Sequence, residues 1–387
     1  MDYQEFIQSK RVVDQPTGLT EIPELNPKLF DFQRDIVKWA LRRGRACVFA
    51  DCGLGKSPIQ LEWSRVVAAH TGRPVLILAP LAVSRQTERE GKKFGIDVTI
   101  CREQSDVRPG VNVTNYEMFD HFTASEFSGV VLDESSILKN YMGVTKRTLI
   151  EQFERTLFKL CCTATPAPND HMELGNHAEF LGSMGSNEML ARWFINDSMQ
   201  AGNYRLKRHG ARDFWHWVAS WACALEKPSD FGDYDDTGYI LPELRIVVKT
   251  VDAPPPPGML FHTGETLSAT EIHKVKRDTA GIRAKAAAEF VAADHAQCLV
   301  WCDTNYEADA LDAEIIGAVD VRGSDSDAKK TESLFRFANG EERILVTKPS
   351  VAGYGMNFQN CHRAAFIGLS YSFEALYQAI RRIWRFG

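Results

Sequence analysis

The chain has 387 residues, a length typical of two or three domains. Apolar residues make up 44% and charged residues 25%, which is the balance of a folded globular protein and excludes disorder over most of the length. Lys and Arg total 45 against 51 for Asp and Glu, so the net charge of -6 excludes a general basic coating for nucleic acid but not a local basic groove.

The sequence predicts neither a membrane span nor a secretory signal. Its longest nearly unbroken apolar run, residues 75–83, is too short to cross a bilayer. The opening residues MDYQEFIQSK lack the apolar core of a signal peptide. The nine cysteines are scattered without a CxxC pair, which favours buried thiols in a reducing compartment over disulfides or a zinc site.

Short apolar runs rich in Val, Ile and Leu alternate with helix-length segments through the first half of the chain. The runs that we expect to be strands are 46–50, 75–79, 111–115, 129–132 and 157–163. Segments such as 30–42 and 58–69 have the length of helices. Strands that are apolar along their whole length and alternate with helices predict a mostly parallel, doubly wound α/β sheet.

This alternation stops near residue 171 and resumes after residue 240. The later strands are expected at 244–251, 298–302, 318–321, 344–347 and 364–368. We therefore predict two tandem α/β domains joined by a helical segment. The expected parts are an N-terminal segment 1–28, a first domain 29–170, a helical inter-domain segment 171–240 and a second domain 241–387. The four prolines at 254–257 fit either a stiff linker or a surface turn.

The strongest local signal is FADCGLGKS, residues 49–57, which lies between a predicted strand and a predicted helix. Gly53 and Gly55 let the backbone approach an anion, and the N-terminus of the following helix favours negative charge. Lys56 supplies a charge for nucleotide phosphates, and the Ser57 hydroxyl can bind magnesium. Ala50 stands where the full phosphate-loop pattern has its first glycine, so the loop alone indicates only a nucleotide phosphate.

Two adjacent carboxylates follow another predicted strand. Asp133 is the candidate for holding magnesium, and Glu134 the candidate for orienting and deprotonating an attacking water. An isolated Asp-Glu pair is more often a solvated turn. This pair ends a predicted central strand, however, and open α/β sheets bind ligands beyond the strand ends, which favours the functional interpretation.

With these segments the chain resembles the superfamily 2 helicases, most closely their Swi/Snf-type translocase branch, from about residue 29 to residue 387. The resemblance rests on motifs in the order of the family: LFDFQRDIVKW, LILAPLAVSRQ, VTNYE, DESSILKN, CCTATPAPN, LVWCDTNYEADAL, VAGYGMNFQN and YQAIRRIWRFG. In DESSILKN, Ser135 and Ser136 replace the usual Ala and His, which leaves the metal and water roles of the acidic pair intact. Lys330 stands where the family commonly has arginine.

In the first domain the resemblance implies roles for three further residues. Gln33 would contact the adenine edge, although an exposed helix glutamine is the plain alternative. Thr163 and Thr165 would couple the nucleotide state to movement by switching hydrogen bonds, although a strand ending in a Pro-rich turn would look the same.

In the second domain the resemblance implies that Gly355 and Gln378 contact the nucleotide. Arg382 and Arg385, three residues apart on one predicted helix face, would reach the γ-phosphate and stabilise charge in the transition state. A basic surface helix is the alternative. The residues implied in nucleic-acid contact are Pro80, Thr114, Thr304, Gly353 and Asn357.

The resemblance implies two tandem RecA-like domains of the P-loop NTPase class, with ATP and Mg²⁺ bound between them. The implied activity is that of an ATP-dependent DNA helicase or translocase, an ATP hydrolase whose partner is nucleic acid, with double-stranded DNA favoured. We expect a monomer without membrane attachment in the cytoplasm of a bacterium or a phage-infected host, because compact versions are common in phages. In the family a further strand and helix follow the last motif, so we also expect a shortened version of a longer chain.

Two features and two functions are weighed as alternatives. The basic cluster at Arg205, Lys207, Arg208, His209 and Arg212 fits either phosphate contact or a solvated face. The nearby tryptophans at 215, 217 and 221 fit core packing better than base stacking. A nucleotide-gated binding module for nucleic acid or protein, with little turnover, is the alternative function. A P-loop kinase would not explain the motifs of the second domain.

Overall fold

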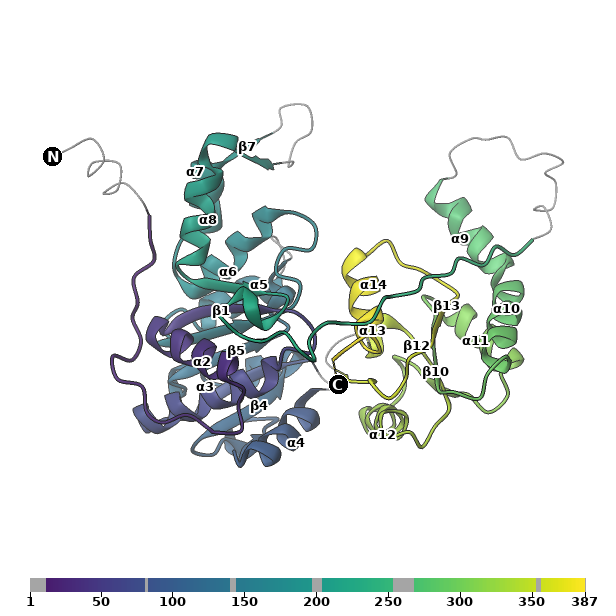
Figure 1. Ribbon diagram of the computed structural model, residues 1–387, viewed down its shortest axis with the longest axis horizontal. Helices are drawn as coiled ribbons and strands as arrows, with labels where there is room; N and C mark the ends of the chain where they lie inside the picture. The colour runs from purple at the N-terminus through teal and green to yellow at the C-terminus, as the bar shows by residue number, and fades with distance from the viewer. Residues whose placement is uncertain are drawn as a thin grey trace. The chain divides into compact units, whose positions relative to one another are not determined.

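The computed structural model describes residues 12–80, 83–139, 144–196, 204–252, 268–352 and 356–386. The chain divides into two compact units, residues 1–240 and residues 241–387, and each is described by itself (Figure 1). This division falls at the expected start of the second domain.

The first unit is built on a sheet of seven strands in the order β3-β4-β2-β5-β6-β1-β9. All of its pairings are parallel. The strands are β1 (Arg45–Ala50), β2 (Val75–Ala79), β3 (Val98–Ile100), β4 (Val111–Asn115), β5 (Gly129–Asp133), β6 (Phe158–Cys162) and β9 (Ala222–Leu225). The five strands predicted in this half are all present. They are apolar throughout because both faces of the sheet are covered.

Helices cover both faces of this sheet (Figure 1). They are α2 (Asp31–Arg43), α3 (Lys56–Thr71), α4 (Ser84–Phe94), α5 (Val144–Gln152), α6 (Leu174–Leu181), α7 (Ser186–Trp193) and α8 (Ala211–Ala219). Helices α2 and α3 contact the strands from one side. On the other side Cys47, Leu76 and Leu132 of the strands share a buried core with Ala178 of α6 and Trp217 of α8.

The sequence analysis predicts a helical segment between the domains at residues 171–240. In the structure these residues are part of the first unit. They carry α6, α7 and α8, an antiparallel pair β7 (Phe194–Asn196) and β8 (Tyr204–Leu206), and β9, which pairs with β1. The physical reason is the aromatic content of the segment. Trp217 and Trp221 are fully buried, which confirms core packing for these two, whereas Trp215 is 43% exposed.

The second unit has a parallel four-stranded sheet in the order β11-β12-β10-β13. Its strands are β10 (Cys298–Trp301), β11 (Val319–Val321), β12 (Ile344–Thr347) and β13 (Ala364–Phe366). Its helices are α9 (Ala269–Asp278), α10 (Ala280–Ala292), α11 (Asn305–Glu314), α12 (Asp327–Ala338), α13 (Pro349–Ala352) and α14 (Phe373–Ile380). Alternate strand residues such as Val300 and Val346 pack with α10 and α11 in one core.

The strand expected at 244–251 is absent from the described part of this unit. Its residues are extended but unpaired, and Ile246, Val247 and Val248 are 70%, 72% and 87% exposed. A run of β-branched residues suits a strand, but without a neighbouring strand to bond with it forms none. The prolines at 254–257 lie outside the described residues.

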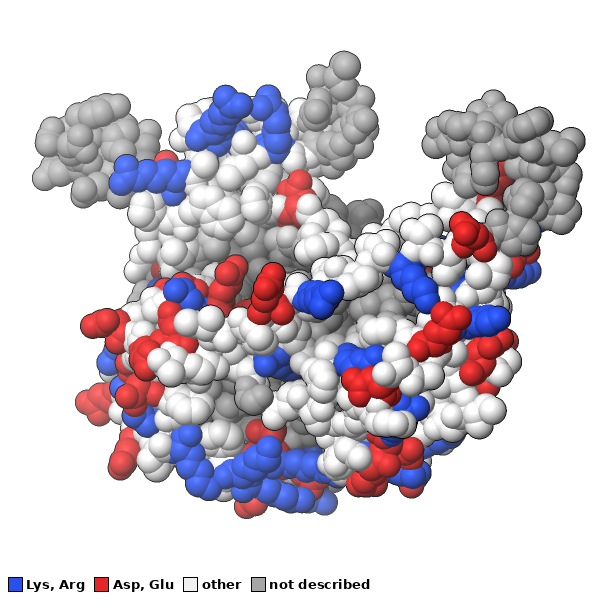
Figure 2. Space-filling view, turned by 45° about the vertical axis from the view of Figure 1, so that its right-hand side comes forward, with Lys and Arg blue, Asp and Glu red and all other residues white. Residues whose placement is uncertain are grey.

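The predicted fold class is confirmed, since both units are α/β with parallel sheets as in RecA-like domains. Among the described residues, no helix combines the length and apolar character needed to cross a bilayer. On the face drawn in Figure 2, acidic and basic side chains are interspersed, in line with the small net charge.

Candidate nucleotide site

Three neighbouring strands of the first unit bring the predicted motifs to one edge of the sheet. The order places β6 between β5 and β1. The glycine-rich loop follows β1, the Thr163–Thr165 motif follows β6, and the acidic pair ends β5. Because the carboxyl ends of parallel strands meet at the same edge, the three motifs lie beside one another.

The glycine-rich loop has the backbone shape of a phosphate cradle. Gly53 and Gly55 have φ angles of 95° and 79°, a conformation that favours glycine. Helix α3 begins at Lys56, so its N-terminal N–H groups face the loop. The Lys56 ammonium donates to the carbonyls of Ala50 at 2.9 Å and of Asp51 at 3.4 Å, which holds its charge over the loop.

Gln33 supports this loop from α2. Its side-chain amide donates to the Leu54 carbonyl at 3.0 Å, and its oxygen accepts from the Phe30 N–H at 3.1 Å. The residue is only 4% exposed, so it is not the exposed helix glutamine of the plain alternative. These bonds join α2 to the glycine-rich loop.

The acidic pair is buried, and Asp133 bonds to Gln60 of α3 and to Tyr116, the residue that follows β4. Asp133 and Glu134 are each 6% exposed. Gln60 donates to the Asp133 carboxylate at 2.9 Å, and the Tyr116 hydroxyl donates to the Asp133 carbonyl at 2.8 Å. These contacts fix the position of Asp133 relative to α3, the helix that follows the glycine-rich loop.

Burial raises the pKa of Asp133 to about 6, and the neighbouring Glu134 carboxylate adds to the rise, while Gln60 and Lys56 oppose it. The negative charge of two adjacent buried carboxylates is therefore not balanced by nearby positive charge. A bound cation would supply that charge, so the residues present fit a divalent metal ion.

The threonine motif contacts the acidic pair directly. The Thr163 hydroxyl donates to the Glu134 carboxylate at 3.3 Å, and the Thr165 N–H donates to the Thr163 hydroxyl at 3.1 Å. Thr163 is fully buried and Thr165 is 8% exposed. These two hydrogen bonds connect Glu134 to the segment that leads into α6.

Arg382 and Arg385 of the second unit do not share a helix face, because α14 ends at Ile380; Arg382 lies in the turn that follows and Arg385 lies beyond that turn. They nevertheless meet at one atom, since each donates to the Met356 carbonyl, at 2.9 Å and 3.1 Å. Arg382 is 1% exposed and also bonds to the buried Gln378. Arg385 is half-buried.

The residues expected to contact nucleic acid are spread over both units. Pro80 is half-buried directly after β2, and Thr304 precedes α11. Asn357 donates from its amide to Gln359 at 3.0 Å. Thr114 is 1% exposed within β4, so its side chain does not reach the surface of the unit. Gly353 and Gly355 lie outside the described residues.

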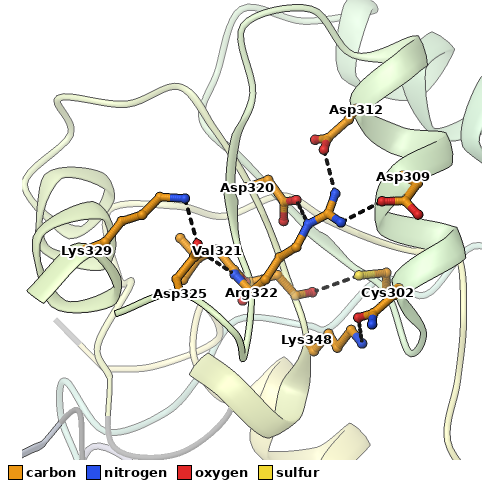
Figure 3. Close-up of polar contacts among 11 residues, drawn as sticks. Cys302, Asp309, Asp312, Asp320, Val321, Arg322, Asp325, Lys329 and Lys348 are labelled. Atoms are coloured by element: carbon orange, nitrogen blue, oxygen red, sulfur yellow. Dashed lines mark hydrogen bonds and ion pairs between the residues drawn. The ribbon is translucent and has the colours of Figure 1, made fainter. Parts of the chain in front are cut away.

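A polar network lies at the carboxyl ends of the strands in the second unit (Figure 3). Arg322 bonds to Asp309 at 2.5 Å and Asp312 at 2.7 Å, both on α11, and also to Asp320 on β11. The hydrogen bonds to Asp320 and Asp309 raise the pKa of Arg322 above its usual value. Lys348 donates to Asn305 at 2.7 Å. Arg322 thus joins α11 to β11, and Lys348 holds the first residue of α11, next to Thr304.

The sequence analysis did not identify Gln60 and Tyr116 as site residues. Gln60 lies one helical turn after Lys56 on α3, so its spacing places it on the face of the helix that carries the lysine. Tyr116 comes directly after β4 and had no comparable signal in the sequence.

Comparison with known proteins finds one matching family model and similar solved structures. A family model described as the helicase conserved C-terminal domain matches residues 283–387. A search of curated protein sequences finds no match. One similar solved structure is the SWI2/SNF2 ATPase core of Sulfolobus solfataricus in complex with double-stranded DNA, with 16% identity, 90% of this chain and 84% of that chain covered, and a TM-score of 0.48. Another is the Hef helicase domain of Pyrococcus furiosus, with 13% identity, 91% and 92% coverage, and a TM-score of 0.49.

The family match falls on the part of the chain that carries the last helicase motifs, including the arginines after α14. The first unit carries the glycine-rich loop and the acidic pair. Residues 283–387 match the helicase conserved C-terminal domain, so this part of the chain is similar to helicases, as the sequence motifs predict.

Proposed function

We propose that the protein is an ATP-dependent DNA translocase or helicase that hydrolyses ATP at the edge of the first sheet. The observation that carries this proposal is the chain of contacts there. Glu134 accepts a hydrogen bond from Thr163, and Asp133 is bonded to the helix that begins at Lys56. Water activation, metal binding and phosphate binding thus belong to one connected set of side chains.

In this proposal the first unit binds the nucleotide. The loop glycines and Lys56 hold the β- and γ-phosphates, and Gln33 lies by the base. Ser57 and Asp133 would hold Mg²⁺, which when bound neutralises phosphate charge. Glu134 accepts a proton from the attacking water, and its buried position excludes competing solvent.

The second unit would complete the site when the two units close on the nucleotide. Arg385 and Arg382 would then stabilise charge on the transferred phosphoryl group, with Gln378 and Gly355 beside them. Release after hydrolysis would shift the grip of both units on a nucleic-acid backbone, at Pro80, Thr304, Gly353 and Asn357. The Swi/Snf-type motifs favour tracking along double-stranded DNA in the cytoplasm of a bacterium or a phage-infected host.

Two substitutions test the hydrolytic site. Glu134→Gln removes the proton acceptor but keeps the shape, so it should lower ATP turnover about a hundredfold or more while ATP still binds. Lys56→Ala should weaken ATP binding itself, because it removes the charge over the phosphate loop. Turnover by malachite-green phosphate assay and affinity by a fluorescent ATP analogue separate the two effects.

The matched control is Glu126→Gln, an exposed carboxylate of the same unit that lies outside the quoted motifs. It should turn over ATP like the unaltered chain. Wild-type turnover by Glu134→Gln would refute the assignment. It would leave the nucleotide-gated binding module, the alternative that the sequence allows, as the better account.

A further inference from the structure

His177 and Ser135 form a buried contact that the proposed hydrolysis does not use. The His177 Nε2 atom lies 3.1 Å from the Ser135 hydroxyl, and both residues are fully buried. Ser135 follows Glu134 directly and begins the short helical turn Ser135–Lys139. His177 comes from α6, 42 positions further along the chain.

A buried serine at this position needs a partner. In the helicases that the motif resembles, alanine is usual here, and alanine makes no such bond. A hydroxyl and an imidazole are costly to bury unless each has a hydrogen-bond partner, and here each is within bonding distance of the other. Burial lowers the pKa of His177 to about 4, so the ring is neutral near pH 7 and offers one donor and one acceptor.

The imidazole also touches the strand that leads into the phosphate loop. The Phe49 ring meets it edge-on, with centroids 5.2 Å apart and planes at 78°. Phe49 belongs to β1, which ends at Ala50. His177 therefore contacts the residues that precede the phosphate loop and the residue that follows the acidic pair.

Helix α6, which carries His177, is held in place by bonds to neighbouring elements. Buried Lys146 of α5 bonds to Asn176 at 2.8 Å and to Glu179 at 3.0 Å, on either side of His177 in the helix. Lys159 of β6 donates to the Phe180 carbonyl at 2.7 Å. Because α6 is tied to two other elements, the position of His177 is set by the fold and not by the acidic loop.

The backbone at Glu134, the second residue of the acidic pair, has a conformation that the surrounding residues must hold in place. Glu134 has a φ of 56°, and it is the one residue other than glycine with a left-handed backbone in the described part of the chain. That conformation costs free energy for a residue with a side chain, and it persists only where the surroundings hold it. The carboxylate of Glu134 is held by Thr163, but its backbone direction depends on the residues that follow.

We propose that His177 is a positioning residue, which bonds to Ser135 and thereby holds the Glu134 backbone in the conformation that activates water. This inference rests on the proposed function. It assigns the histidine no contact with ATP. Loss of the bond therefore slows the chemical step and leaves ATP binding in place.

The test compares Ser135→Ala, His177→Leu, the double variant and His177→Gln, with Ser136→Ala as control. Ser136 is 4% exposed in the same turn, and no hydrogen bond ties its side chain to another described residue. Ser135→Ala and His177→Leu should each lower kcat about tenfold, with the KM for ATP changed less than about twofold. His177→Gln, which keeps a polar group in reach of Ser135, should recover most of the loss.

The double variant should be no slower than the worse single variant, because both changes break one bond. Additive losses, or a kcat for Ser135→Ala equal to that of Ser136→Ala, would overturn the proposal. Glu134→Gln in the same assay separates the two claims, since turnover in that variant contradicts the hydrolytic site and not the histidine contact.

Hydrogen exchange gives a second reading that needs no turnover. Backbone amides of 133–139 should exchange faster in Ser135→Ala and in His177→Leu than in the unaltered chain. In Ser136→Ala their exchange rates should equal those of the unaltered chain. Equal exchange in all of these proteins would contradict the proposed constraint, whatever the ATPase assay shows.

Discussion

Gly55 determines how closely the phosphate loop can pack against α2. Its φ is 79°, and a Cβ atom placed on it would lie 2.2 Å from the amide nitrogen of Gln33. The same amide bonds to the Leu54 carbonyl. The residue therefore combines two demands, a left-handed backbone and an open space for the glutamine that supports the loop.

Gly55→Ala should consequently lower the free energy of unfolding by more than the cost of the left-handed backbone alone. Gly72 is a matched control because its φ is 66° but nothing lies within 4 Å of a Cβ placed there. Gly72→Ala should lower the free energy of unfolding by about 1 kcal/mol, the cost of the backbone alone. Gly55→Ala should lower it further and also weaken ATP binding. Equal losses in urea denaturation, with ATP affinity intact, would show that the loop tolerates the side chain.

His177 should make stability depend on pH. Its pKa is about 4 in the folded protein, against about 6.5 in an unfolded chain. The unfolded state therefore binds more protons between these values, and the stability present above pH 6.5 is lost as the pH falls toward 4. The loss should approach about 3 kcal/mol relative to His177→Gln. Urea denaturation of both proteins from pH 7 to pH 4 measures it, and parallel curves would show that the imidazole is not neutral and buried.

At the scale of elements, the strands predicted from apolar runs are found where the run is buried on both faces, as in β1, β2 and β5. The three-residue strand β3 and the strand β9 were missed, since neither has a long apolar run. The run 244–251 was predicted as a strand and is unpaired, because pairing depends on a neighbour that local sequence does not specify.

The candidate site was predictable only in part, for a related reason. Lys56, Asp133 and Glu134 belong to local motifs that can be recognised within a few residues. The contacts of Gln60 with Asp133 and of His177 with Ser135 join positions 73 and 42 residues apart, so they depend on strand order. The turn after α14 also ends a helix that the spacing of the arginines had predicted to continue.

The Arg322 network makes a prediction about α11 and β11 (Figure 3). Arg322→Met leaves Asp320, which is 14% exposed, without its cation and frees Asp309 and Asp312. The change should destabilise these elements by about 1–3 kcal/mol, measured by faster hydrogen exchange in both. Lys249→Met is the control, because its ion pair with Glu289 lies at the surface of the same unit, with side chains 57% and 61% exposed. A similar effect of both substitutions would mean that the network adds no stability of its own.

At the scale of the whole molecule, the proposal divides one reaction between two units. The first unit holds the glycine-rich loop, the carboxylates and the Thr163–Thr165 motif on adjacent strand ends. The second matches the helicase conserved C-terminal domain over residues 283–387 and carries arginines in that stretch. If nucleic acid brings the units together around ATP, hydrolysis must depend on nucleic acid, and contacts with its backbone must weaken as salt is raised.

The most direct test is the rate of ATP hydrolysis by the unaltered chain in Mg²⁺, measured with and without double-stranded DNA at low salt. The account predicts slow turnover alone and turnover about tenfold or more faster with duplex DNA, an increase that disappears as salt is raised. A rate that duplex DNA, single-stranded DNA and RNA all leave unchanged would contradict a motor that couples ATP to nucleic acid.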